Sequence, residues 1–113
     1  MSEIEEIVKN LQLELRRGAM TLCVLSQLKG PKYGYGLVEL LEQKGVRIEP
    51  GTLYPLLRRL EDQDLLKSEW KTTGSKPRKY YELNDTGKMI YGFLCSEWCD
   101  MNDTINQLIN EEQ

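Results

Sequence analysis

Residues 49–61 combine an apolar stripe with a polar face at helical spacing. The apolar positions recur at i, i+3, i+4 and i+7, which predicts a helix that buries one side. They are Leu53, Leu56, Leu57 and Leu60. The opposite side carries Thr52, Pro55, Arg58 and Arg59. A hydroxyl and two guanidinium groups on an exposed face can contact phosphate oxygens or guanine edges, so the pattern predicts a recognition helix for DNA.

Two further helices are predicted before this one. Apolar residues recur at helical spacing across residues 4–28, interrupted only by Gly18, and this segment is either one bent helix or two. Residues 35–44 form a short second helix, which Gly45 closes as a C-terminal cap. Together with the helix at 49–61, the second helix makes a helix-turn-helix.

A β-hairpin is predicted next. Residues 65–70 and 78–83 are short runs whose aromatic residues suit a pleated surface, and a glycine and a proline lie between them. The turn is basic, with lysine or arginine at positions 71, 76, 78 and 79, which favours a wing that contacts DNA. Alternation along the strand puts Arg78 on one face and Lys79 on the other. The alternative is a hairpin tip whose charges are merely solvated.

A last helix is predicted to run to about residue 111, with Asp85 or Thr86 as its N-cap. Its apolar residues recur every three or four positions and form a stripe close to a heptad seam, which requires a partner helix. They are Ile90, Leu94, Trp98, Met101, Ile105 and Leu108. We expect this seam to form a two-fold homodimer interface to which the N-terminal helix contributes, because two-fold dimers are the commonest oligomers. The alternative is that the seam packs on the chain's own N-terminal helix.

With 113 residues, 40% of them apolar and 29% charged, the chain fits one compact unit with a modest core. Within it we expect residues 1–83 to form a winged helix-turn-helix domain that binds DNA, and residues 84–113 to form the dimerisation helix. The predicted fold class is mostly α with a small β-hairpin. No run of about 18 apolar residues exists, and the acidic start lacks the features of a signal peptide, so we expect a cytoplasmic protein.

The formal net charge of −3 does not favour nucleic acid, but the charges are segregated along the chain. Residues 58–81 hold seven Lys or Arg and four Asp or Glu, a balance of +3. Residues 82–113 hold one basic residue and seven acidic ones, a balance of −6. A basic central third is therefore available for DNA beside an acidic tail.

The chain lacks residues that many enzymes use for catalysis. It contains no histidine, so Ser-His and Cys-His dyads and the usual zinc and facial-triad iron sites are absent. No glycine-rich phosphate loop follows a strand, and we expect neither a cofactor nor a metal. Cys23, Cys95 and Cys99 lie in apolar helical contexts and are predicted to be reduced core thiols. Cys95 and Cys99, four residues apart on one helix face, leave a soft metal in a dimer as the alternative.

Five short motifs, in order and spread over most of the chain, resemble the PadR family of bacterial winged-helix transcriptional regulators. They are Arg17-Gly18, Tyr33-Gly34-Tyr35-Gly36, Gly51-Thr52-Leu53-Tyr54-Pro55, Arg59-Leu60-Glu61, and Arg78-Lys79-Tyr80-Tyr81 followed by Leu83 and Gly87. The single long helix after the wing resembles the smaller subfamily. The resemblance implies a homodimer that represses transcription and that, in some members, is released by an aromatic or drug-like compound.

The chain departs from the family pattern before the Gly-Thr-Leu-Tyr run, where Glu49-Pro50 replaces a Ser-like cap. Proline suits the first turn of a helix, but Pro55 inside the helix removes a hydrogen bond and pushes against the preceding turn. We therefore expect the helix to start late, at Gly51 or Thr52, or to have a distorted first turn. Glu49 also adds a negative charge near the expected phosphate, which would weaken DNA affinity.

The predicted DNA contacts lie on the entry to the second helix, on the recognition helix and on the wing. They are Lys32, Tyr33, Tyr35, Thr52, Tyr54, Arg58, Arg59, Lys71, Ser75, Lys76, Arg78 and Lys79. The family resemblance supports Tyr35, which the residues alone would place in the core, and Lys32 is expected to be exposed. Tyr54 either contacts DNA or packs on the second helix. Arg58 and Arg59 point about 100° apart, so we expect Arg58 to face DNA and Arg59 to pair with Asp62 or Glu61.

Trp98 stands in the middle of the seam, where it would meet its symmetry mate. In small PadR-like proteins an aromatic residue at a similar place lines a cavity between the subunits that stacks flat aromatic compounds. Leu94, Cys95 and Met101 can complete the wall of such a ligand site. The alternative is a closed dimer core that binds nothing.

The sequence thus predicts a transcriptional regulator, a homodimeric repressor whose partners are an operator duplex, a second copy of itself and a small aromatic ligand. Two-fold symmetry predicts half-sites about 10 bp apart. The alternative is a protein-interaction module, a winged helix whose acidic tail and Glu49 have removed DNA affinity and whose seam binds another regulator.

Overall fold

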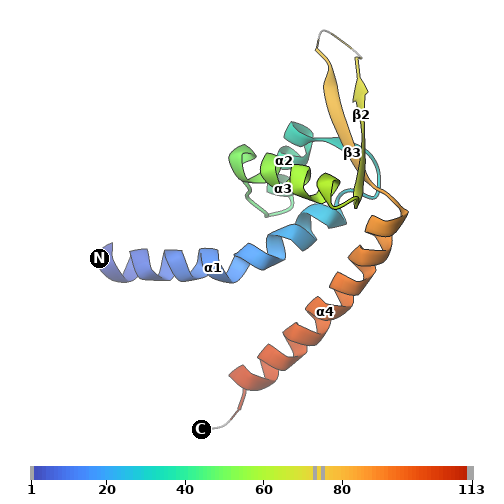
Figure 1. Cartoon of the computed structure of the whole chain (residues 1–113). Coiled ribbons are helices and arrows are strands. Elements are labelled where there is room, and N and C mark those ends of the chain that lie inside the picture. Colours follow the sequence, from blue (N-terminus) through green and yellow to red (C-terminus); the bar gives the residue numbers. More distant parts are fainter. Residues whose placement is uncertain (1, 73, 75, 112–113) are drawn as a thin grey trace.

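A computed structural model describes residues 2–72, 74 and 76–111 of the chain. Its elements follow in the order α1 (Ser2–Ser26), β1 (Lys32–Tyr33), α2 (Gly34–Gln43), α3 (Pro50–Asp62), β2 (Leu66–Lys71), β3 (Arg78–Leu83) and α4 (Asp85–Ile109). Helices α2 and α3 lie at the foot of the β2–β3 hairpin, and α1 and α4 extend from the same core as two arms (Figure 1). The predicted fold class, a mostly helical winged helix-turn-helix followed by one long helix, is confirmed.

Helix α1 is a single helix of 25 residues that bends in its middle (Figure 1), which decides between the two predicted alternatives. Only its C-terminal end joins the core. Val24 and Leu25 are buried there, and Met20 and Cys23 pack against the same cluster. Residues 2–18 are all exposed, so the N-terminal half of α1 projects from the winged-helix unit as an arm.

The second and third helices form the predicted helix-turn-helix, but α3 starts earlier than expected. It begins at Pro50, with Glu49 as its N-cap residue, so of the two expected alternatives the late start is wrong. The Glu49 carbonyl accepts from the N–H groups of both Thr52 and Leu53, each at 2.9 Å. These bonds tighten the first turn, and Pro50 occupies a position at which no N–H is needed. Gly45, with a φ of 92°, makes the turn after α2, as predicted.

The sheet has the strand order β1-β3-β2, so the predicted hairpin carries one extra edge strand. Strands β2 and β3 pair from Leu66 opposite Leu83 to Lys71 opposite Arg78. Strand β1 was not predicted, because two residues carry no periodicity. It pairs Tyr33 with Tyr80 on the other edge of β3. The alternation predicted for β3 is confirmed by burial, since Tyr81 is buried while Arg78 is exposed.

A leucine-rich core joins the helices to the sheet. The four stripe leucines of α3, at positions 53, 56, 57 and 60, are at most 7% exposed. They pack in one cluster with Leu25, Leu28, Leu37, Leu41 and Leu83. Truncation of one such leucine to alanine costs about 2–5 kcal/mol of folding free energy. The apolar side of α3 is therefore fixed to the core, and its polar side is left to the solvent.

The start of α4 is fixed to the turn between α3 and β2. Asn84, rather than the expected Asp85 or Thr86, caps the helix, and its Oδ1 accepts from the Gly87 N–H at 2.7 Å. Gly87 packs against the backbone carbonyl of Leu65 so closely that a Cβ would overlap it. The first turn of α4 is therefore packed directly against the turn that follows α3.

Most of α4 is uncovered within one chain. Ile90 and Tyr91 pack against the core, but every residue from 96 to 111 is exposed. The arms α1 and α4 diverge from their common base (Figure 1), so the alternative in which the seam packs on the chain's own N-terminal helix is wrong beyond that base. The radius of gyration is 16.9 Å, whereas a compact domain of this length has about 13 Å. Within the described ranges, none of the helices has the length and apolarity required to cross a membrane.

Candidate nucleic-acid interface

Helix α3 presents a polar face directly opposite its buried leucines. Thr52, Pro55, Arg58 and Arg59 are all exposed, as the periodicity predicted. Pro55 lies inside the helix without breaking it. The carbonyl that loses its helical partner is that of Gly51, which is also exposed and can bond to water. The helix therefore offers a hydroxyl and guanidinium groups to a groove of DNA.

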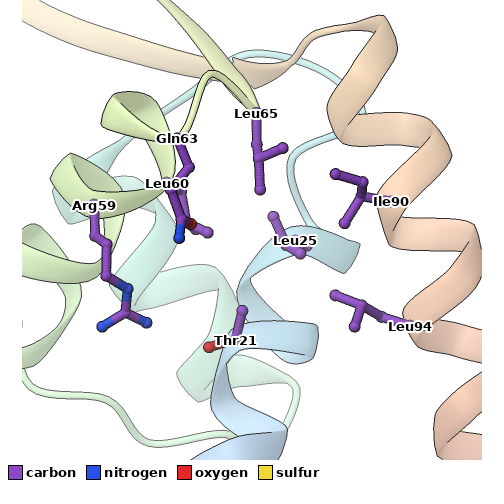
Figure 2. Close-up of a pocket in the computed structure, with 8 residues that line it drawn as sticks. All are labelled: Thr21, Leu25, Arg59, Leu60, Gln63, Leu65, Ile90 and Leu94. Atoms are coloured by element: carbon purple, nitrogen blue, oxygen red, sulfur yellow. The ribbon is translucent and has the colours of Figure 1, made fainter.

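The two arginines of α3 have different surroundings. Arg59 lines a hollow of about 440 Å³ between α1, α3 and α4, in which Thr21 and Gln63 are its polar neighbours (Figure 2). Arg58 does not line this hollow. The expected pairing of Arg59 is wrong, because Glu61 bonds to Ser68 and Lys79 instead, and the described part of the chain holds no ion pair between Arg59 and Asp62.

The entry to α2 is packed against α3 through a glycine. Tyr54 lies over Gly34 so closely that a Cβ on Gly34 would overlap its ring. The Tyr54 side chain remains 38% exposed, so it packs on α2 and still faces the solvent. Tyr35 is 57% exposed, which shows that the residue-based interpretation of Tyr35 as a core residue was wrong. Lys32 is half-buried rather than exposed, because β1 pairs it with Tyr81 of β3.

A groove of about 640 Å³ runs between the wing and the two helices. It gathers six of the predicted contacts, from β1, α2, α3, β3 and the turn before β3. They are Tyr33, Tyr35, Tyr54, Lys76, Arg78 and Lys79. The rest of its lining is Gly34, Glu39, Trp70, Pro77 and Tyr81. Thr52 and Arg58 lie outside the groove on the exposed face of α3, and the predicted contact Ser75 lies outside the described residues.

Cations and aromatic rings alternate on one face of the sheet. The Arg78 guanidinium lies 4.4 Å from the centre of the Tyr33 ring, and Tyr33 meets Tyr80 edge to face with 5.5 Å between ring centres. The Lys71 ammonium lies 4.8 Å from the centre of the Tyr80 ring. Such contacts contribute about 0.5–1 kcal/mol each at exposed sites. They favour positions of Lys71 and Arg78 against the tyrosine rings, beside the entry to α2.

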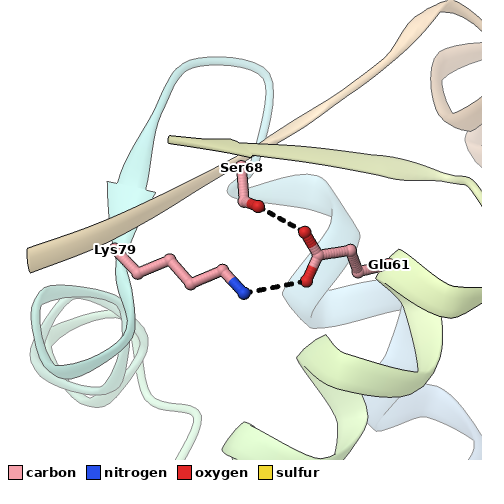
Figure 3. A network of polar contacts seen from close by, with 3 residues as sticks. All are labelled: Glu61, Ser68 and Lys79. Atoms are coloured by element: carbon pink, nitrogen blue, oxygen red, sulfur yellow. Dashed lines mark hydrogen bonds and ion pairs between the residues drawn. The ribbon is translucent and has the colours of Figure 1, made fainter. Parts of the chain in front are cut away.

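The Glu61 carboxylate joins the end of α3 to both strands of the hairpin (Figure 3). The Ser68 hydroxyl donates to Oε2, and the Lys79 ammonium lies 3.1 Å from Oε1. The hydrogen bond from Ser68 and the Lys79 ammonium hold the pKa of Glu61 below its usual value. The hydrogen bond to Glu61 raises the pKa of Lys79. Both partners are therefore stabilised in their charged forms.

The predicted seam on α4 is uncovered after its first turns. Leu94, Trp98 and Met101 are 36%, 46% and 50% exposed. Ile105 and Leu108 are exposed on the same arm, whereas Ile90 packs against the core of its own chain. The exposed half of α1 carries further apolar residues, among them Ile4, Ile7, Val8 and Leu11. Both arms thus carry apolar side chains that no other described residue of the chain buries.

The cysteines are not all core thiols. Cys23 packs against the core as predicted and Cys95 is half-buried, but Cys99 is exposed because it lies on the uncovered part of α4. A hydrogen bond with Cys95, together with burial, raises the pKa of Tyr91. In the described ranges, no group of three or more metal-ligating side chains comes together.

Comparison with known protein families gives a match over most of the folded unit. The profile of the transcriptional regulator PadR-like family matches residues 21–91. The transcriptional regulator Rv3488 of Mycobacterium tuberculosis is 36% identical over 76 residues, which cover 66% of this chain and 71% of that protein.

Solved structures have the same arrangement of elements. A PadR family transcriptional regulator from Eggerthella lenta is 46% identical, with a TM-score of 0.94 over 99% of this chain and 100% of that one. Bacillus subtilis PadR in complex with operator DNA is 23% identical, with a TM-score of 0.62 over 68% of this chain and 46% of that one, a likeness of fold.

Proposed function

The chain belongs to the PadR-like family of transcriptional regulators, and from this premise we propose that it binds operator DNA as a homodimer and represses transcription. The observation that carries the proposal is the groove shared by α2, α3 and the wing, beside the exposed polar face of α3. In this proposal α3 reads base edges in the major groove through Thr52 and Arg58, and the wing contacts flanking phosphates or the minor groove.

The charges near this surface favour DNA binding although the chain as a whole is acidic. Lys76 and Arg78 are exposed on the wing, and Lys71 and Arg78 lie against tyrosine rings. Glu49, the acidic residue at the start of α3, lies 3.7 Å from Arg47, which offsets its charge. Most acidic residues after Glu82 lie on the α4 arm, which points away from the hairpin (Figure 1). These placements favour DNA binding over the protein-interaction module.

The homodimer is supported by the two uncovered arms. A single chain leaves the seam from Leu94 to Leu108 exposed, and a second copy related by a two-fold axis can cover the seam and the exposed apolar residues of α1 together. We keep the functional division proposed from the sequence, with residues 1–83 for DNA and residues 84–113 for dimerisation. The exposed half of α1 is the part of the first segment that serves the second.

The experiment for DNA binding is fluorescence anisotropy with a labelled fragment from upstream of the protein's own gene, at about 50 and 200 mM salt. With four to six phosphate contacts, the affinity should fall by about two to three orders of magnitude between these salt concentrations. The Arg58→Ala/Lys76→Ala variant should lose binding. Its matched control, Lys9→Ala/Lys88→Ala, removes the same charge from α1 and α4 and should bind nearly as wild type.

Lack of binding to that fragment and to bulk genomic DNA at low salt would contradict the proposal. The interaction module with an apolar helix partner would then be favoured, since such binding hardly depends on salt. Repression is tested by a separate measurement, the amount of transcript. Deletion of the gene should raise the amount of transcript from the bound promoter, and a lower amount would instead indicate an activator.

We further propose that Trp98 forms a ligand site for planar aromatic compounds between the two subunits. Trp98 is 46% exposed and has Leu94, Met101 and the half-buried Cys95 nearby on α4. In a Trp70→Phe background, Trp98 is the only tryptophan, so its fluorescence reports on this site alone. Quenching by planar aromatic compounds supports the site, and unchanged fluorescence at saturating concentration contradicts it.

A further inference from the structure

One carboxylate bridges the two elements that the proposed function assigns to DNA. Glu61 lies in the last turn of α3. It accepts a hydrogen bond from Ser68 on β2 and pairs with Lys79 on β3 at 3.1 Å (Figure 3). The three residues come from three different elements, and Glu61 and Lys79 are 18 positions apart in the sequence. A local contact within the helix therefore cannot replace this bridge.

The bridge acts partway along the hairpin rather than at its base. The base is anchored by apolar residues, among them Leu66 and Tyr81, which are buried in the core. Ser68 lies two residues beyond Leu66, and Lys79 lies two residues before Tyr81, so both partners stand closer to the tip. A paired hairpin pivots about its anchored base, and a contact farther along it sets the angle between the wing and α3.

The same bridge determines what Lys79 can do. Lys79 lines the groove between the wing and the helices, next to Arg78 and Tyr54. Its ammonium faces Glu61, and the pKa shifts of both residues favour the charged pair. A phosphate would have to compete with a carboxylate that is already in place. The groove thus contains one cation that is directed inward, toward α3.

We propose that Glu61 is a positioning residue that, through Ser68 and Lys79, sets the wing relative to the recognition helix and keeps Lys79 from making an unselective phosphate contact. This inference rests on the proposed function. Phosphate contacts fix register and base contacts specify sequence. Discrimination between operator and other DNA therefore depends on whether α3 and the wing reach one duplex in a fixed geometry.

The test compares Glu61→Gln with Glu82→Gln. Glu82 forms a second ion pair on the described part of the hairpin, with Lys67 at 3.8 Å, and both carboxylates have side chains that are 28% exposed. Both variants remove one negative charge from the same region. The Lys67–Glu82 pair, however, joins β2 to β3 and does not reach α3. Affinities are measured by anisotropy for the upstream fragment and for a scrambled fragment of equal length.

We expect Glu61→Gln to lower the ratio of operator affinity to scrambled-DNA affinity by about three- to tenfold, a coupling of the size found within one ion-pair network. Glu82→Gln should leave that ratio within about twofold of wild type, since charge alone changes both affinities together. A role limited to folding stability would reduce both affinities by the same factor. Equal ratios in Glu61→Gln and wild type overturn the inference, as does an equal loss in both variants.

Ser68→Ala supplies a second variant that changes no charge. It removes the hydroxyl donor from Glu61 and should lower the ratio of operator affinity to scrambled-DNA affinity in the same direction, by a smaller factor. It therefore tests the inference even if Glu61→Gln does not fold. The reversed pair Glu61→Lys/Lys79→Glu should recover part of the ratio lost in Glu61→Lys alone. If the wild-type protein binds the two fragments with equal affinity, both the proposed function and this inference are overturned. If the wild-type protein prefers the upstream fragment and Ser68→Ala has the same affinity ratio as wild type, the inference alone is overturned.

Discussion

The side-chain amide of Asn84 donates a hydrogen bond of 2.8 Å to the backbone carbonyl of Asp64, which ties the start of α4 to the turn after α3. Asp64 has a φ of 63°, a left-handed conformation that aspartate tolerates better than most residues. The same Asn84 side chain caps α4 through the Gly87 N–H. The arm proposed for dimerisation and the helix proposed to read DNA therefore meet at one asparagine.

Replacement of Asn84 by alanine removes both hydrogen bonds at once. The loss of an N-cap costs about 1 kcal/mol, and the loss of a hydrogen bond to a backbone carbonyl costs about as much again. We expect Asn84→Ala to lower the free energy of unfolding by about 2 kcal/mol, measured by urea denaturation at a fixed protein concentration.

Asn106→Ala is the matched control for this change. Asn106 lies on the same helix with an exposed side chain, and its removal should change the free energy of unfolding by less than about 0.5 kcal/mol. If the two asparagine variants unfold at the same urea concentration, Asn84 does not connect α4 to the rest of the chain in the way described.

Tyr33 supports the wing rather than standing alone as a DNA contact. Its ring lies under the Arg78 guanidinium at 4.4 Å and against Tyr80. Tyr33→Leu removes the aromatic face and frees Arg78, so we expect operator affinity to fall by about fivefold, in line with a cation–π contact of about 1 kcal/mol.

Tyr33→Phe separates the ring from its hydroxyl. Because the aromatic face is retained, this variant should bind the operator within about twofold of wild type in the anisotropy assay. An equal loss of affinity in the phenylalanine and leucine variants would instead assign the effect to the phenol hydroxyl, as a direct phosphate contact.

The Glu61 bridge should also make folding stability depend on pH. Its hydrogen bond from Ser68 and the Lys79 ammonium hold the pKa of Glu61 below the usual 4.5. A carboxyl group whose pKa is lower in the folded state contributes stability above its unfolded pKa, and this contribution is lost as the pH falls through the folded pKa. Lys79, whose pKa lies above the usual 10.5, contributes stability that is lost only as the pH rises through that folded pKa.

The measurement is the difference in free energy of unfolding between wild type and Glu61→Gln, taken at several pH values by urea denaturation. We expect wild type to be the more stable protein by a constant amount between about pH 6 and pH 9, with the difference shrinking as the pH falls below about 4.5. A difference that stays constant down to the most acidic native sample would show that the Glu61 carboxylate is not stabilised by folding.

The helix-turn-helix and the wing could be predicted because short-range periodicity sets them. The spacing of Leu53, Leu56, Leu57 and Leu60 leaves one way to bury the stripe, and all four are buried. The family resemblance, carried by five motifs, is confirmed by a match over residues 21–91. The helices and strands themselves can be predicted because each one's pattern lies within its own short segment.

Other features depend on contacts that no local pattern contains. Asn84, Asp85 and Thr86 can all cap a helix, and the Asp64 carbonyl, 20 residues earlier, is the partner that favours Asn84. Glu61 was expected to attract an arginine of its own helix, yet it pairs with Lys79 of β3, 18 residues later. Strand β1 forms because Tyr33 pairs with Tyr80 at the edge of β3 that β2 leaves free.

The seam on α4 can be tested with one substitution and a neighbour as its control. Ile105 lies in the apolar stripe and Thr104 on the adjacent flank of the helix, and both are exposed in a single chain. An aspartate at position 105 of a two-fold interface would bury one charge from each subunit. We therefore expect Ile105→Asp to weaken dimerisation by about 100-fold or more. Thr104→Asp adds the same charge outside the stripe and should leave the dimer intact. Both variants are measured by sedimentation velocity across a range of concentrations.

Because position 105 lies on the exposed part of α4, outside the core, a monomeric Ile105→Asp variant should still fold but lose most of its operator affinity, since each half-site is then bound without its partner. A monomer that binds the operator as tightly as wild type would mean that one winged helix suffices and that the seam serves another partner.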